Sequence, residues 1–301
     1  MKYIIASRGS KLALYQANHV CNRLRELFPE HSWEVETFTT TGDRFLDRPL
    51  SFFGGKGAFL KEIEEAMLSG KAHLAVHSLK DVPGEESSGL QLSAFLPRED
   101  PRDVWISQQD DLMHLKIGGR IGTSSLRRQL LVQLYRSDVQ VESLRGNVDT
   151  RLRKLREGQY DALVLAAAGL HRLQLFDESY MHYLSEDAFI PAIGQAIMVV
   201  QTMLDPDLIE MVRSLNDPAS EVAANIERGF IIQYKGGCHL PVGGHAVKRG
   251  DQWHFHAFIG GIQSGRIIQE VVESEDPDFC APAMYERLEQ LGARELLAEL
   301  E

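Results

Sequence analysis

Six arginines lie close to the ends of strand-like segments, where side chains of an α/β protein can meet in one cleft. They are Arg8, Arg127, Arg128, Arg145, Arg151 and Arg172. A guanidinium group binds a carboxylate or a phosphate through two parallel hydrogen bonds. The spacing therefore predicts a site for a ligand that carries several carboxylates or phosphates. Arg153, Lys154 and Arg156 fit better as a solvated helix face.

Smaller polar residues accompany these arginines at the same strand ends. Ser10 stands at a strand–helix junction, and Thr123 and Ser125 in "GTSSLRRQ" are candidates for capping a helix. Lys80 and Asp81 follow an apolar strand in "HSLKDVP". Each has a structural alternative, because Ser, Thr and Asp often cap helices and turns, and Asp81 could cap the turn before Val82 and Pro83.

Cys238 stands in "YKGGCHLPVGGH", where nothing around it resembles a core helix. A disulfide, a metal ligand, a catalytic thiol and a covalent attachment point are all open interpretations. Three cysteines exclude a complete disulfide framework. Cys21 has the helical spacing of a core residue, and Cys280 is expected to pack at a helix start. A zinc site with His254 and His256 lacks the usual ligand spacing.

The elements that must position these residues alternate between strand and helix. Residues 3–7, 33–40, 73–78 and 90–96 read as strands, with helices at 11–28 and 58–68. The same order begins again at residue 119 and runs to about 173. This pattern predicts two α/β lobes with mostly parallel sheets and a cleft between them, with ligands at the carboxyl ends of the strands.

The remaining segments complete one lobe and form a third unit. The apolar run 188–204 is expected to return the chain to the first lobe and complete its sheet. A helix at 217–234, three antiparallel strands between 243 and 275, and a helix at 282–299 predict a small α+β domain. The expected boundaries are 1–98 with 197–216 for domain 1, 99–196 for domain 2 and 217–301 for domain 3.

Composition narrows the function classes. Apolar residues make up 44% of the 301 residues, which is typical of a globular protein. The net charge of −11 argues against a nucleic-acid or membrane-surface binder, although residues 120–156 hold nine basic and three acidic side chains. No segment has the ~20 apolar residues of a membrane span, and the first residues are too short an apolar run for a signal peptide. A cytoplasmic location is expected.

Several ordered motifs resemble the porphobilinogen deaminase family. They are "ASRGSKLALYQA", "GGKGAFLKEIE", "HSLKDVP", "REDPRD", "GTSSLRRQ", "RGNVDTRL", "AAGLHRL" and "GGCHLPVG". The resemblance runs from about residue 3 to the end and is loose after about residue 245. It implies two lobes like those of type II periplasmic binding proteins, with a central cleft, plus a small α+β domain, in a monomer without a metal.

The resemblance also implies roles for individual residues. Cys238 matches the cysteine that holds a dipyrromethane cofactor through a thioether. Lys80, Asp81, Thr123, Ser125, Arg127 and Arg128 match residues that bind the cofactor. The substrate-binding positions are Arg8, Ser10, Phe59, Arg145, Arg151, Arg172 and Gln195.

The implied reaction joins four porphobilinogen molecules head to tail with loss of ammonia, and water then releases linear hydroxymethylbilane. Asp81 matches the catalytic carboxylate, which stabilises the positive charge that develops on a pyrrole N–H. Ala196 departs from the family pattern, in which a glycine follows the glutamine. A cytosolic polycarboxylate-binding or sensor protein on the same two lobes is the alternative, and an RNA-binding lobe lacks the aromatic residues that such sites need.

Overall fold

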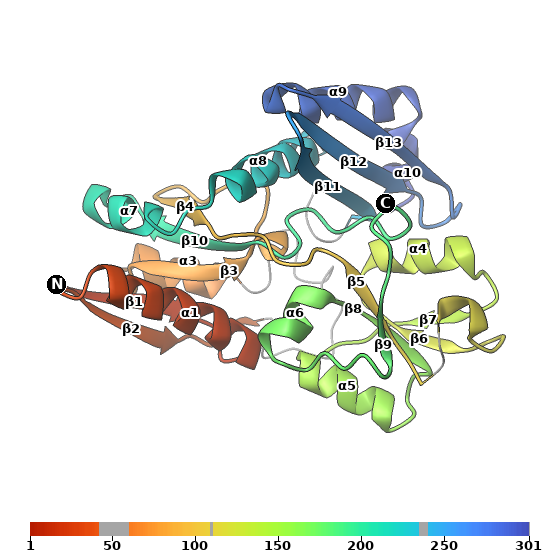
Figure 1. The fold of residues 1–301 in the computed structure, drawn as a ribbon, viewed down its shortest axis with the longest axis horizontal. Coiled ribbons are helices and arrows are strands. Elements are labelled where there is room, and N and C mark those ends of the chain that lie inside the picture. Colours follow the sequence, from red (N-terminus) through yellow and green to blue (C-terminus); the bar gives the residue numbers. More distant parts are fainter. Residues whose placement is uncertain (42–59, 109–110, 235–239, 301) are drawn as a thin grey trace.

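The computed structural model describes residues 1–41, 60–108, 111–234 and 240–300. The first lobe is a five-stranded sheet in the order β2-β1-β3-β10-β4 (Figure 1). Its strands are β1 (Lys2–Ser7), β2 (Ser32–Thr37), β3 (Leu74–Ser78), β4 (Leu90–Phe95) and β10 (Met198–Met203). Its helices are α1 (Lys11–Leu27), α3 (Lys61–Leu68) and α7 (Pro206–Arg213). β1, β2 and β3 are parallel, whereas β10 is antiparallel to both of its neighbours.

The second lobe repeats this arrangement in the order β7-β6-β8-β5-β9. Its strands are β5 (Asp103–Ile106), β6 (Arg120–Gly122), β7 (Gln140–Glu142), β8 (Ala162–Ala166) and β9 (Met181–Tyr183). Its helices are α4 (Leu126–Tyr135), α5 (Val148–Arg156) and α6 (Ala167–Arg172). β5 takes the antiparallel position that β10 has in the first sheet. The chain therefore crosses between the sheets twice, after β4 and before β10.

The third unit is an antiparallel sheet of β11 (Val242–Arg249), β12 (Gln252–Gly260) and β13 (Ile267–Ser274). It packs against α8 (Pro218–Gln233), α9 (Pro277–Gln290) and α10 (Ala293–Ala298). Phe230, Phe255 and Met284 lie at the centre of this core and are fully buried. In Figure 1, α8 lies between the first sheet and the third unit.

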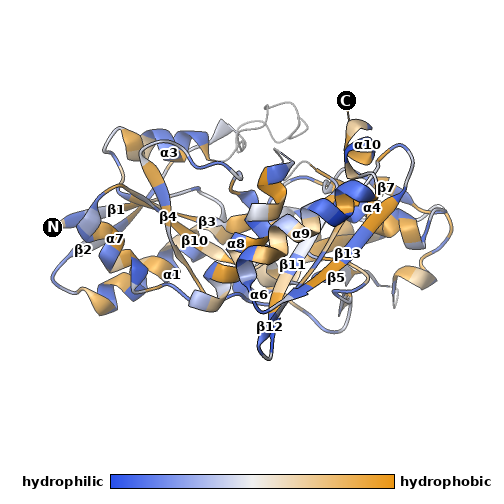
Figure 2. Ribbon diagram, turned by 90° about the horizontal axis from the view of Figure 1, so that it is seen from above, coloured by the Kyte–Doolittle hydropathy of each residue, from blue (hydrophilic) through white to orange (hydrophobic). Residues whose placement is uncertain are grey.

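Burial follows the periodicity of the sequence. In α1, Ala17, Val20, Cys21 and Leu24 face the first core and have no exposed surface, as the helical spacing predicts. In β12, burial alternates from one residue to the next around Phe255, which is fully buried between two less buried neighbours. In Figure 2, hydrophobic and hydrophilic residues alternate along helices such as α1 and α3.

The prediction of two α/β lobes with a small α+β domain is confirmed, and so is the return of the apolar run 188–204 to the first sheet, where it forms β10. The predicted single helix at 282–299 is wrong. α9 begins earlier, at Pro277, because Asp276 caps it, and it ends before Gly292, whose φ of 92° separates it from α10. No helix in the described ranges is long and apolar enough to cross a membrane.

Candidate active site

The ends of β1 and β3 open onto a cavity of about 70 Å³ in the first lobe. Arg8, Ser10, Ser78 and Asp81 contribute polar groups to its lining, and Ile63 contributes an apolar wall. Ser10 also caps α1, because its side chain accepts a hydrogen bond from the Ala13 N–H at 3.2 Å. Three of the residues predicted to bind or transform a ligand therefore share one cavity.

Asp81 ends the short helix η2 (Leu79–Asp81), and its side chain is exposed. Within the described residues its carboxylate accepts no hydrogen bond, so the capping alternative lacks the contact that would define it. Its negative charge acts on groups from both lobes, since it opposes the lowering of the pKa of His77, Lys80 and Arg151. Asp81 therefore lies where the two lobes face each other.

Lys80 precedes Asp81 and points towards the crossing segment. Its Nζ donates to Gln195 Oε1 over 3.4 Å. Burial, and next the positive charge of Arg128, lower the pKa of Lys80 to about 8. Because burial and a neighbouring cation both disfavour the charged ammonium, an anion that binds beside Lys80 would stabilise its protonated form.

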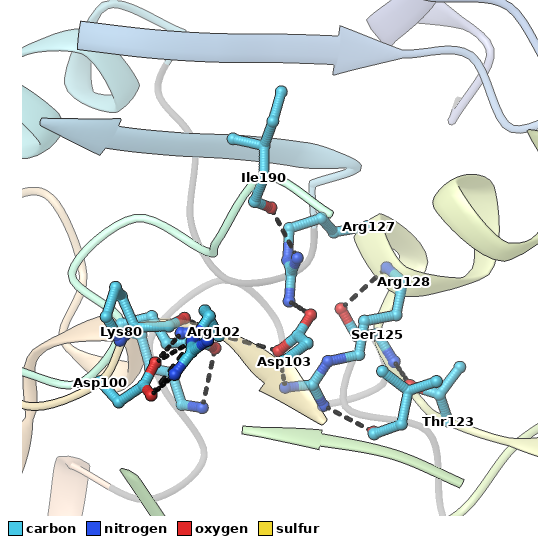
Figure 3. A network of polar contacts seen from close by, with 12 residues as sticks. Lys80, Asp100, Arg102, Asp103, Thr123, Ser125, Arg127, Arg128 and Ile190 are labelled. Atoms are coloured by element: carbon cyan, nitrogen blue, oxygen red, sulfur yellow. Dashed lines mark hydrogen bonds and ion pairs between the residues drawn. The ribbon is translucent and has the colours of Figure 1, made fainter. Parts of the chain in front are cut away.

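The guanidinium groups of Arg127 and Arg128 converge on Asp103 at the start of β5, as Figure 3 shows. Arg127 Nη2 donates to Asp103 Oδ2 over 2.6 Å, and Arg128 Nη2 donates to Oδ1 over 2.8 Å. Gln195 Nε2 donates to Oδ1 as well, over 3.0 Å. Burial would raise the pKa of the Asp103 carboxyl, but the two arginine charges outweigh it and hold that pKa far below its usual range.

This cluster has an excess of positive charge and unused donors. Asp103 neutralises only one of the two arginines, and Lys80 adds a further cationic group. Among the described residues, Arg127 Nε, Arg128 Nε and Arg145 Nη1 are buried without a hydrogen-bond partner. A buried donor without a partner costs about 1–3 kcal/mol. A ligand with several carboxylates, such as a dipyrromethane, fits this donor set.

Thr123 and Ser125 form the start of α4. The Ser125 side chain caps the helix by accepting from Arg128 N, and Ser125 N donates to Thr123 Oγ1. The cap fixes the backbone of Arg128, which explains why two small hydroxyl residues precede the arginine pair. Their predicted contact with the cofactor stays a prediction.

Arg145 and Arg151 lie on either side of the turn that leads into α5. Arg151 Nε donates to the Gly146 carbonyl over 2.7 Å. Burial, and next the charge of Arg128, lower the pKa of Arg151 to about 10. These two arginines belong to the same electrostatic cluster as Asp81 and Arg128.

Arg172 has a different environment. Its Nε donates to Glu99 Oε1 over 2.8 Å, and its Nη2 donates to the Ala196 carbonyl over 2.9 Å. The side chain is only 3% exposed. It connects Glu99 with Ala196, which lie in the two segments where the chain crosses between the lobes. Ala196 has a φ of 72°, the left-handed region that favours glycine, which explains why a glycine is expected there.

Two predicted site residues, Phe59 and Cys238, lie outside the described residues. The other two cysteines, Cys21 and Cys280, are unpaired and have no exposed surface. His254 Nδ1 lies 2.9 Å from Glu273 Oε1 on β13, which gives this histidine a carboxylate partner.

Several residues that hold the site together were not identified from the sequence. Asp103 begins an apolar strand. The sequence could have indicated its role only indirectly, because a cluster of buried arginines needs a buried counter-charge. Glu227 and Arg228 lie inside α8, where an adjacent acid and base suggest a solvated surface. Yet Glu227 is fully buried and binds Arg98 through both carboxylate oxygens, at 2.7 and 2.8 Å.

Comparisons with known proteins agree with this geometry. The family model described as "Porphobilinogen deaminase, dipyromethane cofactor binding domain" matches residues 3–210. A porphobilinogen deaminase of Aliarcobacter butzleri is 40% identical over all of this chain and 98% of the relative. One of Francisella tularensis is 42% identical over 99% of each chain.

Solved structures with a similar fold include the periplasmic VFT2 domain of Bordetella pertussis BvgS, at a TM-score of 0.43 and 15% identity over 78% of this chain and 93% of that chain. A likeness at that level carries no argument about function. The family match spans more than two thirds of the chain, and the relatives match along its full length. The chain belongs to the porphobilinogen deaminase family.

Proposed function

We propose that the chain is a hydroxymethylbilane synthase, a transferase that joins four porphobilinogen molecules head to tail with loss of ammonia. The observation that carries the proposal is the cationic cluster beside Asp81, with three buried guanidinium nitrogens that have no partner among the described residues. Each pyrrole unit carries an acetate and a propionate, so the growing chain supplies the carboxylates that this cluster lacks. Nothing favours the sensor alternative over an enzyme of this family.

In the proposed site, residues of both lobes hold a dipyrromethane on Cys238. Lys80, Thr123, Ser125, Arg127 and Arg128 bind its carboxylates. When bound, the dipyrromethane supplies the pyrrole carbon to which the first substrate is joined. Arg8, Ser10, Phe59, Arg145, Arg151, Arg172 and Gln195 bind and orient the incoming porphobilinogen.

Asp81 is the proposed catalytic residue. Asp81 lines the same cavity as Arg8 and Ser10. There it stabilises the positive charge that develops on a pyrrole N–H of the substrate as ammonia leaves. After the carbon–carbon bond forms, a carboxylate oxygen of Asp81 accepts the proton that the pyrrole carbon must lose.

The proposal also covers the organisation of the chain. Domain 1 comprises residues 1–98 and 197–216, domain 2 comprises 99–196, and domain 3 comprises 217–301. The three sheets fall within these ranges. The enzyme is proposed to act as a cytoplasmic monomer without a metal.

Intact mass spectrometry of the purified protein tests the proposal. The wild-type chain should carry the added mass of two pyrrole units and convert porphobilinogen into hydroxymethylbilane. Cys238→Ser should fold without that mass and without turnover. Cys280→Ser is the matched control, because Cys280 is buried inside α9 and should keep both properties. A Cys238→Ser protein with normal turnover would rule out the assigned attachment point.

A further inference from the structure

Two adjacent residues of α8 fix both ends of the segment that carries Asp81. This segment runs from Leu79 through η2 to Gly84, and within the described residues Asp81 itself makes no hydrogen bond through its side chain. An exposed carboxylate on a short 3₁₀ turn depends on its backbone anchors for its position. The third domain supplies the downstream anchor directly and supports the upstream one through Gly194, while the first lobe itself also holds Leu79.

The downstream anchor is Arg228. Its Nη1 donates to the Pro83 carbonyl over 3.0 Å, and its Nη2 donates to the Gly84 carbonyl over 2.9 Å. The residue is only 7% exposed. The two carbonyls are two and three residues beyond Asp81, so this fork of hydrogen bonds fixes the path of the chain that leaves η2.

The upstream anchor is Glu227. Its Oε2 accepts from the Gly194 N–H over 2.6 Å, and Oε1 accepts from Ala246 N over 2.8 Å. Gly194 packs so closely on Leu79 that a Cβ there would lie 2.7 Å from Leu79 Cγ. Leu79 N in turn donates to the Ile197 carbonyl over 2.9 Å. Glu227 thus fixes the position of Gly194, against which Leu79 packs at the start of the Asp81 segment.

α8 is itself fixed to the first lobe. Arg98 N donates to Ser220 Oγ over 2.8 Å, and Asp217 N donates to the Phe95 carbonyl over 2.7 Å. A rigid helix that is anchored at its first turn can transmit the position of the third domain to the loop that it contacts. The same helix ends at Gln233, five residues before Cys238 in the sequence.

From these contacts we infer that Arg228 is a positioning residue for Asp81, which couples the cysteine-bearing domain to the catalytic carboxylate. This inference rests on the proposed function, because it takes Asp81 as the catalytic group. Among the described residues, the hydrogen bonds of Arg228 go to the backbone beyond Asp81, so Arg228 is expected to affect the rate through the position of Asp81. Misplacement of a reacting group by about 1 Å can lower a rate by about 10²-fold.

The first test measures the loop without any turnover. In Arg228→Met, hydrogen exchange at the Val82 amide, which donates to the Leu79 carbonyl over 3.0 Å, should become at least about tenfold faster, because the two carbonyl anchors beyond it are lost. Arg213→Met is the matched control, since it removes an arginine that is 63% exposed on α7. Unchanged exchange in folded Arg228→Met would overturn the inference.

The second test is a double-mutant cycle with Asp81→Asn. In holoenzyme confirmed by mass, Arg228→Met should lower kcat by roughly 10- to 100-fold while KM changes much less. In the Asp81→Asn background the same change should cost less than about threefold, since the two residues act as one unit. An equal loss in both backgrounds would show a merely structural role and contradict the inference.

A conservative variant covers the case in which Arg228→Met does not fold. Arg228→Lys can still reach one of the two carbonyls, so its exchange rate and kcat should lie between those of Arg228→Met and the wild type. If Arg228→Lys equals the wild type in both measurements, the two-point contact has no positioning role. If the wild-type chain does not convert porphobilinogen, the proposed function fails. The exchange experiment still tests whether Arg228 fixes the backbone beyond Asp81.

Discussion

Asp103 Oδ2 lies 2.6 Å from Arg127 Nη2, and neither side chain is more than 3% exposed. The carboxylate binds Arg128 through its other oxygen, so a single buried acid orients both arginines of α4. Two adjacent guanidinium groups could not stay together at this depth without such a counter-charge. Asp103 therefore determines which faces of the two arginines remain available to a ligand.

Asp103→Asn should destabilise the protein by about 3–5 kcal/mol, because it leaves two buried cations without their anion. Urea unfolding measures the loss. Glu157→Gln is the control: it removes the partner of Arg153 in an exposed pair on α5, which contributes only about 0.3–0.5 kcal/mol. Equal stabilities for the two variants would show that the buried triad contributes no more than a surface pair.

The same acid predicts a pH dependence. The pKa of Asp103 is lowered in the folded protein, so its contribution to stability is present above the ordinary pKa of about 3.9 and is lost as the pH falls below it. The difference in unfolding free energy between wild type and Asp103→Asn should therefore be constant near pH 7 and narrow below about pH 4. A constant difference down to pH 2 would contradict this assignment.

Lys80 should limit cofactor assembly at alkaline pH. Burial and Arg128 lower its pKa to about 8, so the ligand-free site loses a positive charge as the pH rises through that value. The rate at which apo protein gains the dipyrromethane mass from porphobilinogen should fall over this range. Lys80→Arg should keep its charge and remove the fall, whereas Lys61→Arg, at a lysine that is 71% exposed, should behave like wild type.

Asp81→Asn should fold with near-native stability, keep the cofactor and elongate at least about 10²-fold more slowly, because it lacks the charge that stabilises the transition state. Rapid-quench mass spectrometry would show the slow appearance of one-substrate complexes. Asp205→Asn is the control, since Asp205 caps α7 and Asn caps equally well. Elongation at the wild-type rate would show that Asp81 only stabilises the turn and is not catalytic.

Gly194→Ala should be strongly destabilising. Its φ of 69° costs an L-residue about 1–2 kcal/mol, and the added Cβ, 2.7 Å from Leu79, costs about 1–3 kcal/mol more through overpacking. Gly158→Ala is the control, because Gly158 has a φ of 70° but no atom within 4 Å of the added Cβ. Thermal unfolding separates the two costs, and equal losses would exclude the clash with Leu79.

The fold could largely be predicted because its elements are regular. The alternation of Trp253, Phe255 and Ala257 with polar residues predicted β12, and the helical spacing of Ala17, Cys21 and Leu24 predicted α1. The boundaries near the C-terminus could not be predicted in the same way. A single apolar pattern extends through 282–299, and the break depends on the backbone conformation of Gly292, which the pattern does not contain.

The site was predictable where its residues follow strands, as Ser10, Lys80 and Asp81 do. It was not predictable where function depends on tertiary burial. Glu227 and Arg228 are ordinary polar residues of a helix until the fold places a loop backbone against each of them. No local sequence signal carries that information, because the partners lie between 19 and 145 residues away along the chain.

The position of β10 has a consequence for how the protein is made. β10 lies between β3 and β4, so the first sheet contains a gap at its centre until residue 203 has left the ribosome. Until then β3 and β4 expose unpaired backbone edges, which are sites of misassociation for a nascent chain. The whole second lobe must be synthesised during this interval, and so the amino-terminal lobe, although translated first, is the lobe whose folding has to wait.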